Sequence, residues 1–318
     1  MLSSTADTVE RWIKDNAHSL GAIDADSALT DLSPLHEMTR DARLVVLGVS
    51  LRDTHELAVV SHRVLRLLVK ELGFRSLAIE GDDATSALLD EYVCKGIGDP
   101  RVLLANARSF WRTGELLAAV TWLRWHNDRH PGDPVRIVNL AGHPRRPVSQ
   151  QDSLGDIERL LAENVIWWHE RTGHKVVYWG GIAHTATSRS RTISPSTPPA
   201  VHRSAGSYFR EFFGSGHLSV GLTFHHGSTS YDIPAPPAEF AEAVLGASGM
   251  DAYLLDLRAP STPEVRAWLD RPTMTRLIGP VYDPGDDAAY HLSGGSLAEW
   301  FHIIVHCQQV TPARALNS

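Results

Sequence analysis

Several features that would assign a protein to a class are missing from this chain. Its 318 residues contain two cysteines, Cys94 and Cys307, which is too few for a disulfide framework and does not give a zinc-binding spacing. No apolar run approaches the roughly 20 residues that a membrane span requires. No basic tract accompanies the net charge of −7, so we expect neither a membrane nor a nucleic acid as partner.

Three common catalytic signatures are also absent. The sequence contains no Gly-x-Ser-x-Gly elbow, no Gly-x-Gly-x-x-Gly loop and no Walker motif. These absences argue against an ordinary serine hydrolase, a dinucleotide-binding enzyme and a P-loop protein, and we expect no cofactor. The first 20 residues are typical of a polar amphipathic helix and not of a signal peptide, so we expect a cytoplasmic protein.

Strand and helix patterns alternate along the chain, which has 43% hydrophobic residues. This alternation predicts an α/β fold, a three-layer sandwich with a largely parallel central sheet. We expect one domain over residues 1–318, with a helical insertion at 82–130 that could cap one edge of the sheet. Residues 135–140 predict a strand. Residues 185–203 are rich in Ser, Thr, Pro and Arg and predict a loop too polar to pack.

The most informative segment is 44–81. It predicts a buried strand, a polar loop, an amphipathic helix and a second strand that ends at Glu80. The loop holds four ionisable residues, Arg52, Asp53, His55 and Glu56. In open α/β sheets the ligand crevice lies at the carboxyl ends of the strands, so both strand ends are expected to contribute to one site.

Glu80 and Glu56 are the candidate carboxylates of this site. Glu80 begins an acidic run with Asp82 and Asp83, which suggests a metal or a cationic partner, and Arg52 is the obvious partner. We favour Arg52 and therefore no metal. The alternatives are a metal site from Glu56, Glu80, His55 and His184, or helix capping by the acids.

Other candidates follow later strands or precede the expected cap. His184 follows a strand and two glycines, which makes it a candidate base, as is His55; we expect Glu56, Glu80 and His184 to converge. The substrate-binding candidates are Arg52, Asp82, Trp111, Arg112, Glu115 and His226. Arg112 could instead pair with Glu115, and His226 could compensate for a base missing elsewhere.

Five segments, in order, resemble the erythromycin esterase family. The first combines Gly48, Glu56 and the pair Leu72-Gly73 with Ala78-Ile79-Glu80. The others are Phe110–Glu115 with Trp122–Asn127, then Ala162–Trp167, then Val176–Trp179 with Ala183-His184, and finally Ile278–Tyr282 with Ala313–Leu316. The resemblance covers most of the chain and implies the family's α/β fold.

The chain departs from the family at its catalytic positions. Val49 stands at the position of the family's first Glu, and Arg52 at that of the His expected to activate water. Ser61 lies near the position of a family Arg, Gly181 takes the place of the first His of a Trp-Ala-His-Asn pattern, and Ala289 lies near that of a later His. Hydrolysis of macrolides is therefore expected to be impaired.

The resemblance implies an enzyme that acts on a small molecule by acid/base catalysis, in secondary metabolism. The reactions in question are ester or lactone hydrolysis, acyl transfer, cyclisation or elimination. The alternative is a non-catalytic homologue that retains the pocket and binds a small molecule.

Overall fold

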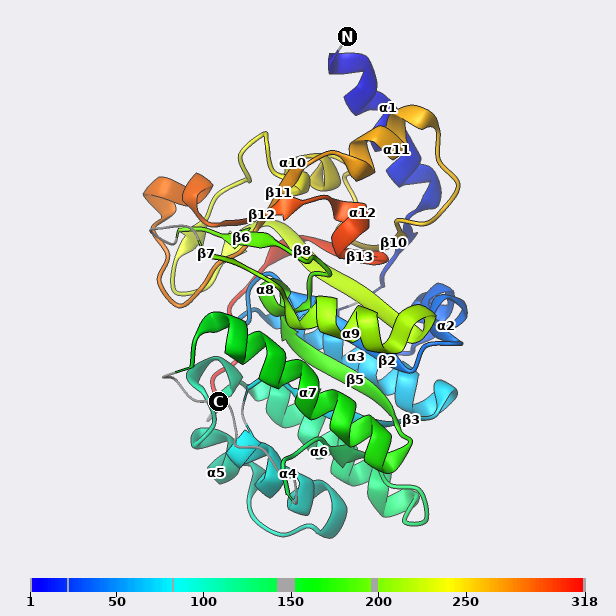
Figure 1. Cartoon of the computed structure of the whole chain (residues 1–318), viewed down its shortest axis with the longest axis vertical. Helices are drawn as coiled ribbons and strands as arrows, with labels where there is room; N and C mark the ends of the chain where they lie inside the picture. Colours follow the sequence, from blue (N-terminus) through cyan, green and yellow to red (C-terminus); the bar gives the residue numbers. More distant parts are fainter. Residues whose placement is uncertain (1, 22, 82, 142–151, 196–199, 317–318) are drawn as a thin grey trace.

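Helices and strands alternate along most of the chain, as the sequence predicts (Figure 1). The computed structural model describes residues 2–21, 23–81, 83–141, 152–195 and 200–316. The helices are α1 (Leu2–Asn16), α2 (Ser33–Thr39), α3 (His55–Leu72), α4 (Asp83–Lys95), α5 (Pro100–Ala105), α6 (Gly114–Arg129), α7 (Leu154–Thr172), α8 (Ile182–Thr185), α9 (Ala205–Phe213), α10 (Ala241–Gly246), α11 (Pro263–Asp270) and α12 (Leu297–Trp300). The strands are β1 (His18–Ser19), β2 (Leu44–Val49), β3 (Phe74–Ile79), β4 (Arg136–Ile137), β5 (Lys175–Gly181), β6 (Arg191–Ile193), β7 (Ala200–His202), β8 (His217–Ser228), β9 (Asp232–Ile233), β10 (Ala252–Asp256), β11 (Thr273–Arg276), β12 (His291–Gly295) and β13 (Ile303–Val310).

The main sheet is mostly parallel. Its order is β1-β10-β13-β8-β2-β5-β3-β4, with β9 paired to β8. The six strands from β13 to β4 run parallel to their neighbours, whereas β1, β10 and β9 pair antiparallel. Strands β2, β5 and β3 are consecutive in this parallel part of the sheet, so their carboxyl ends lie side by side.

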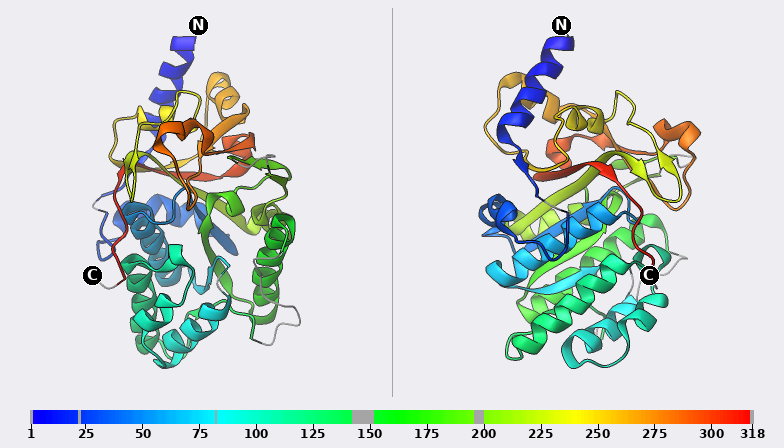
Figure 2. Two further views of the ribbon diagram at one scale, coloured as in Figure 1. Left: turned by 90° about the vertical axis from the view of Figure 1, so that its left-hand side faces the viewer. Right: turned by 180° about the vertical axis from the view of Figure 1, so that it is seen from behind.

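Strand β2 shows why the sheet has helices on both faces. Successive side chains of a strand point to opposite faces. Val45 and Leu47 join the core that contains the apolar side of α3, while Leu44 and Val46 join the core under α7 and α9. All six residues of β2 are buried, as expected for a parallel strand covered on both sides. Figure 2 shows the same three layers.

The structure corrects the interpretation of residues 185–203. In place of a loop too polar to pack, this segment contributes β6 and β7 to a second sheet of order β11-β12-β6-β7. Arg191 on β6 is fully buried, and its charge is compensated by a buried carboxylate. The sequence shows no apolar alternation over Arg191–Ile193 from which such a strand could be predicted. The strand expected at 135–140 is also shorter, Arg136–Ile137.

Residues 83–129 are helical, with α4, α5 and α6 packed on one another. Thr113 caps α6, its hydroxyl accepting from the Leu116 N–H. The short 3-10 helix Ser109–Trp111 precedes that cap and carries two aromatic side chains toward the end of β3. None of the described helices is long and apolar enough to span a membrane.

Candidate active site

Three neighbouring parallel strands each deliver one ionisable side chain to the same place. Arg52 follows β2, Glu80 follows β3, and His184 lies on α8 directly after β5. The Arg52 guanidinium is ion-paired with Glu80, and His184 Nε2 lies 3.5 Å from Glu80 Oε1. The Arg52–Glu80 pair expected from the sequence is present, and Glu80 and His184 lie together at the sheet edge.

Glu80 is the most tightly held of these groups. Its side chain is 6% exposed, and its Oε2 accepts the Gly181 N–H at 2.6 Å. The indole N–H of Trp111 donates to the Glu80 carbonyl at 3.0 Å, so Trp111 supports the site through the backbone. A carboxylate this buried requires partners, and the Arg52 guanidinium supplies the opposite charge.

Two glycines at the end of β5 make room for this pair. A Cβ at Gly180 would collide with the Glu80 carboxylate, and a Cβ at Gly181 would collide with the Arg52 guanidinium. The guanidinium also stacks on the Phe110 ring, 4.6 Å from its centroid. The glycines therefore allow a close approach of the Glu80 and Arg52 side chains to the end of β5.

A second carboxylate, Glu158 on α7, lies behind His184. Its Oε1 is 2.9 Å from His184 Nδ1, 2.6 Å from Arg191 Nη2 and 3.3 Å from His202 Nε2. Its Oε2 accepts the Ala205 N–H at 2.8 Å. Glu158 is fully buried, so this network fixes the orientation of His184 and leaves its Nε2 directed toward Glu80.

The two carboxylates control the protonation of His184. Burial lowers the pKa of His184, but Glu80 and Glu158 outweigh burial and the net pKa is raised. Burial likewise raises the pKa of Glu158, but His184, His202 and Arg191 reverse this and hold it well below its usual value. The neighbouring carboxylates thus favour the protonated form of His184 more than water would, and the neighbouring cationic groups favour the ionised form of Glu158.

Sequence reasoning missed Glu158, Arg191 and His202. A signal for Glu158 existed: it lies four residues after Leu154 and three before Leu161, on the apolar side of α7, where an acid must find partners. No comparable sequence signal indicated Arg191 or His202, because their short strands show no apolar alternation.

His55 and Glu115 belong to a different cluster. His55 Nδ1 lies 2.7 Å from Glu115 Oε1, and Arg314 donates to the same carboxylate from Nε at 3.0 Å and from its backbone N–H at 3.1 Å. Glu115 is thus paired with His55 and Arg314, and not with Arg112 as one alternative had it.

The remaining candidates also have local partners. Glu56 accepts the backbone N–H and the hydroxyl of Thr311, both at 2.7 Å, so it ties the start of α3 to the residue after β13. The expected convergence of Glu56 with Glu80 and His184 is not among the contacts of the described residues. The exposed Arg112 donates to the Ala107 carbonyl at 2.7 Å, and His226 Nδ1 lies 3.0 Å from His225 Nδ1. Asp82 lies outside the described residues.

The geometry at Glu80 does not favour the alternative of a metal site. Within the ranges that the structure describes, no group of three or more His, Cys, Asp or Glu side chains could hold a metal ion. The polar atoms of Glu80 face Arg52 and the Gly181 N–H instead. Arg52 therefore takes the position at Glu80 that a cation would need.

Comparisons with known proteins agree with one another. The family model described as erythromycin esterase matches residues 69–144 and 145–310. Erythromycin esterase type II of Escherichia coli is 27% identical over 118 residues, which are 37% of this chain and 28% of that protein. The match thus spans less than a third of that relative.

Solved structures match nearly the whole chain. A Bacillus cereus protein has a TM-score of 0.81 at 18% identity, and a succinoglycan biosynthesis protein has 0.79 at 19%; each alignment covers 98% of this chain and 99% of the other. A mutant of the erythromycin esterase EreC in its open conformation has a TM-score of 0.68 at 10% sequence identity, and the alignment covers 92% of this chain and 97% of that one. At these identities the likeness shows the fold.

Proposed function

This chain belongs to the erythromycin esterase family, and from that premise we propose that it is a hydrolase-type enzyme that cleaves an ester or lactone of a small molecule at His184. The observation that carries the proposal is the geometry of His184. Glu158 holds its Nδ1 at 2.9 Å, and its Nε2 faces the end of the central strands beside Glu80 and Arg52. Such an oriented imidazole is the basic requirement of a general base or acid.

The proposed reaction uses His184 twice. Its neutral Nε2 accepts a proton from water as the water oxygen attacks the acyl carbon. The resulting imidazolium is stabilised by Glu158 and Glu80, and it then gives the proton to the departing alkoxide. The products are an acid and an alcohol, so atoms and charge balance without a cofactor.

Arg52 is assigned to the developing negative charge on the acyl oxygen. It is ion-paired with Glu80, which also contacts His184, and its side chain is 17% exposed, whereas that of Arg191 is fully buried. A fixed positive charge in a partly dehydrated site stabilises an oxyanion far better than it would in water. Glu80 positions Arg52 and moderates its charge. Residues 82–130 are proposed to cap the site, since Phe110 and Trp111 contact Arg52 and the Glu80 backbone.

The same ion pair favours a second candidate function, a binding protein without turnover. Arg52 stands where the family resemblance places the water-activating His, and it is bound to Glu80 and stacked on Phe110. Loss of a general base lowers rates by about 10²–10⁴-fold. A homologue with this substitution could keep a small-molecule site while losing catalysis, and in either case erythromycin is expected to be hydrolysed slowly.

The test is an assay of the purified protein against aryl esters, γ- and δ-lactones and erythromycin. His184→Asn is expected to lower kcat/KM at least about 100-fold, the effect of losing a general base. His36→Asn changes a partly exposed histidine on α2 that is not part of this cluster; it is the matched control and should have the activity of the wild type. Chelation with EDTA should change nothing, because Arg52 and not a cation neutralises Glu80.

Three results would each contradict a part of this proposal. Equal rates for His184→Asn and wild type would remove His184 from the reaction. Loss of activity on chelation, restored by one added cation, would replace Arg52 with a metal. Stabilisation of the protein by a ligand in thermal unfolding, without turnover of any ester or lactone, would favour the binding protein.

A further inference from the structure

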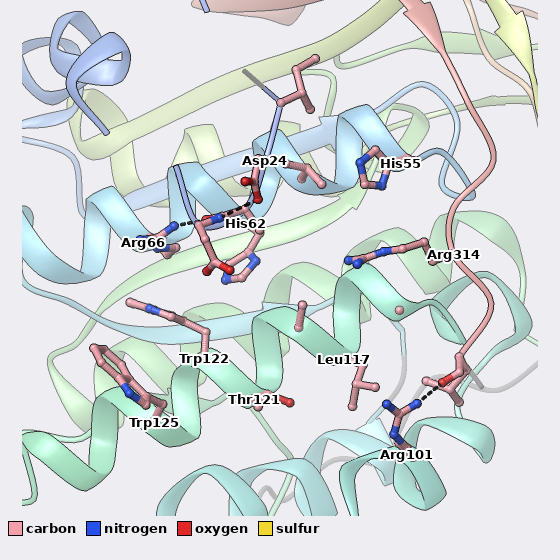
Figure 3. Close-up of a pocket in the computed structure, with 17 residues that line it drawn as sticks. Asp24, His55, His62, Arg66, Arg101, Leu117, Thr121, Trp122, Trp125 and Arg314 are labelled. Atoms are coloured by element: carbon pink, nitrogen blue, oxygen red, sulfur yellow. Dashed lines mark hydrogen bonds between the residues drawn. The ribbon is translucent and has the colours of Figure 1, made fainter. Parts of the chain in front are cut away.

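A polar and aromatic groove of the described structure lies away from His184. It has a volume of about 840 Å³ and runs between α3 and α6, closed by residues 23–26 on one side and by the C-terminal residues on another (Figure 3). Arg52, Glu80 and His184 do not line it. Its volume falls within the roughly 300–1,000 Å³ usual for small-molecule sites.

Each helix contributes one face to the groove. From α3 come His55, Val59, His62 and Arg66, at spacings of four, three and four residues, which place them in one row. From α6 come residues at similar spacings, among them Leu117, Thr121, Trp122 and Trp125. The groove is therefore a regular space between two helices, and its lining is set by the helical repeat.

His62 is the buried polar group that requires an explanation. It is 3% exposed, and neither ring nitrogen has a hydrogen-bond partner among the described residues. Burial, aided by the charge of Arg66, lowers the pKa of His62 to about 3, so it is neutral and offers one donor and one acceptor. Unsatisfied buried polar groups are rare in folded proteins, and a polar atom of a bound ligand would satisfy this one.

The two ends of the groove differ in charge. At one end, Arg66 lies with Asp24 and Asp26, whose carboxylates offset its charge. At the other end lie Arg101 and Arg314 (Figure 3). Arg101 donates to the Leu316 carbonyl at 2.6 Å, and no carboxylate in the described part of the chain pairs with it. Arg314 is ion-paired with Glu115 through its Nε, so the uncompensated positive charge at this second end is that of Arg101.

Between the ends, the walls are apolar and aromatic. Val59 and Leu117 line the centre, and Trp122 meets the His62 ring edge-on at a centroid distance of 5.9 Å. Trp125 extends the aromatic wall and is 48% exposed. A flat apolar body would cover this surface and bury the tryptophan face that solvent now contacts.

We propose that this groove is a second binding site, for a small organic anion with a flat apolar body. Its carboxylate lies between Arg101 and Arg314, its body lies along Leu117 and Trp122, and a polar atom of the body pairs with His62. The site is independent of the reaction at His184, since the two clusters share no residue.

The experiment is calorimetric titration of the full chain with 1-naphthylacetate and with its neutral isostere, 1-naphthylacetamide. The acid is expected to bind at least about 10-fold more tightly than the amide, because only the acid gains the two guanidinium contacts. Arg101→Gln is expected to weaken binding of the acid at least about 5-fold and to leave the affinity for the amide unchanged. Trp122→Phe should weaken both.

The controls separate binding from folding. Arg266→Gln alters another exposed arginine, which is paired with Asp270 on α11, and should bind the acid like the wild type. His62→Phe keeps a ring of similar size and should weaken any ligand that has a polar atom in its body, such as 1-naphthylacetate with a ring hydroxyl. Equal affinity for acid and amide, an unchanged Kd in Arg101→Gln, or no binding of the acid up to about 5 mM would each overturn the proposal.

Discussion

At the scale of single residues, Arg52 and Gly181 depend on each other. The family resemblance places a histidine at each of these positions, and this chain has neither. The Arg52 guanidinium lies where a Cβ at position 181 would be, so a side chain at 181 and an arginine at 52 exclude one another. The two substitutions expected from the resemblance would then share one physical cause.

We therefore predict strong coupling between substitutions at these two positions. Gly181→Ala should destabilise the protein by about 1–3 kcal/mol, the usual range for overpacking, because Arg52 is held by Glu80 and Phe110 and cannot move freely. With Arg52→Ala in place, the added methyl should cost much less. Urea unfolding of both single variants and the double variant measures a coupling energy, expected at about 0.5–3 kcal/mol.

The matched control for this cycle is Gly155→Ala on α7. A Cβ there would meet nothing within 4 Å, so it should be neutral or slightly stabilising. Additivity of Gly181→Ala and Arg52→Ala would show that the two positions do not share space.

A second prediction at this scale concerns the pH dependence of His184. Because its pKa is raised by Glu80 and Glu158 despite burial, its neutral form appears only above the ordinary value of about 6.5. Activity that uses His184 as a base should therefore rise with pH through a midpoint above 6.5. Glu158→Gln removes one of the stabilising anions and should move this midpoint to lower pH.

The measurement is kcat/KM against pH, with an NMR titration of the His184 ring as a readout that does not depend on turnover. Circular dichroism checks that Glu158→Gln folds, since it leaves Arg191 without its carboxylate. A midpoint at or below 6.5, or one that Glu158→Gln does not move, would contradict the assignment of the two carboxylates.

At the scale of elements, the unit β2–α3–β3 shows which features of the fold can be predicted from local sequence. Leu44–Leu47 has no alternation because both faces of a parallel strand are buried, and Gly73 ends α3 in the left-handed conformation, with φ 69°. These are local signals. Arg52 and Glu80 could be predicted as partners because parallel strands end at one edge of the sheet, but the sequence does not show that β5 lies between β2 and β3.

The rest of the site depends on contacts distant in sequence. His184 could be predicted as a strand-end residue, but its partner Glu158 lies 26 residues earlier, and Arg191 and His202 arrive from a second sheet. Glu56 and His55 lie at the same loop yet face other neighbours, Thr311 and Glu115. Loop position alone does not determine which way a side chain points at the start of a helix.

Glu115 links three elements, and this leads to a third prediction. It lies in the first turn of α6 and binds His55 at the start of α3 and Arg314 in the C-terminal tail. Burial raises its pKa, but His55 and Arg314 outweigh burial and the net pKa is lowered. Glu115→Gln should lower stability by roughly 1–3 kcal/mol and increase hydrogen exchange across residues 311–316.

The control is Glu91→Gln on α4, whose exposed ion pair with Lys95 spans 3.9 Å. Such pairs contribute little, so this variant should lie within about 0.5 kcal/mol of the wild type. Faster exchange throughout the chain in Glu115→Gln, with none specific to the tail, would mean that Glu115 does not anchor it.

At the scale of the whole molecule, the many histidines have a collective consequence. The chain has 17 histidines, and several are buried in the neutral form. Burial lowers the pKa of His62, His217 and His306 to about 3, with smaller contributions from neighbouring positive groups. It lowers the pKa of His126 and His302 to about 4. In the unfolded chain all five would titrate near 6.5.

The direction in which stability changes with pH follows from the number of protons that the folded and unfolded states bind. Between pH 6.5 and the folded values, the unfolded state binds more protons, so stability falls as the pH falls. His184 has a raised pKa, and its contribution is present below 6.5 and lost only at higher pH. Carboxylates with a lowered pKa, such as Glu158, lose their contribution below about 4.5. Burial raises the pKa of Glu242 and Asp53, which makes stability increase as the pH falls. These two carboxyl groups oppose the effect of the five histidines, and we expect the histidines to dominate.

We therefore predict that stability falls as the pH is lowered from 7 to 5. Each of the three most shifted histidines should contribute about 2 kcal/mol of this loss at pH 5, or 1.36 kcal/mol for each of the roughly 1.5 pH units below 6.5. Urea unfolding at pH 7, 6 and 5 measures the change. His306→Gln, at a fully buried position whose Nδ1 lies 2.9 Å from the Thr223 hydroxyl, should reduce the difference between pH 7 and pH 5 by about the same 2 kcal/mol, whatever its effect at pH 7. Equal stability at pH 7 and pH 5 would show that these rings already carry protons in the folded protein.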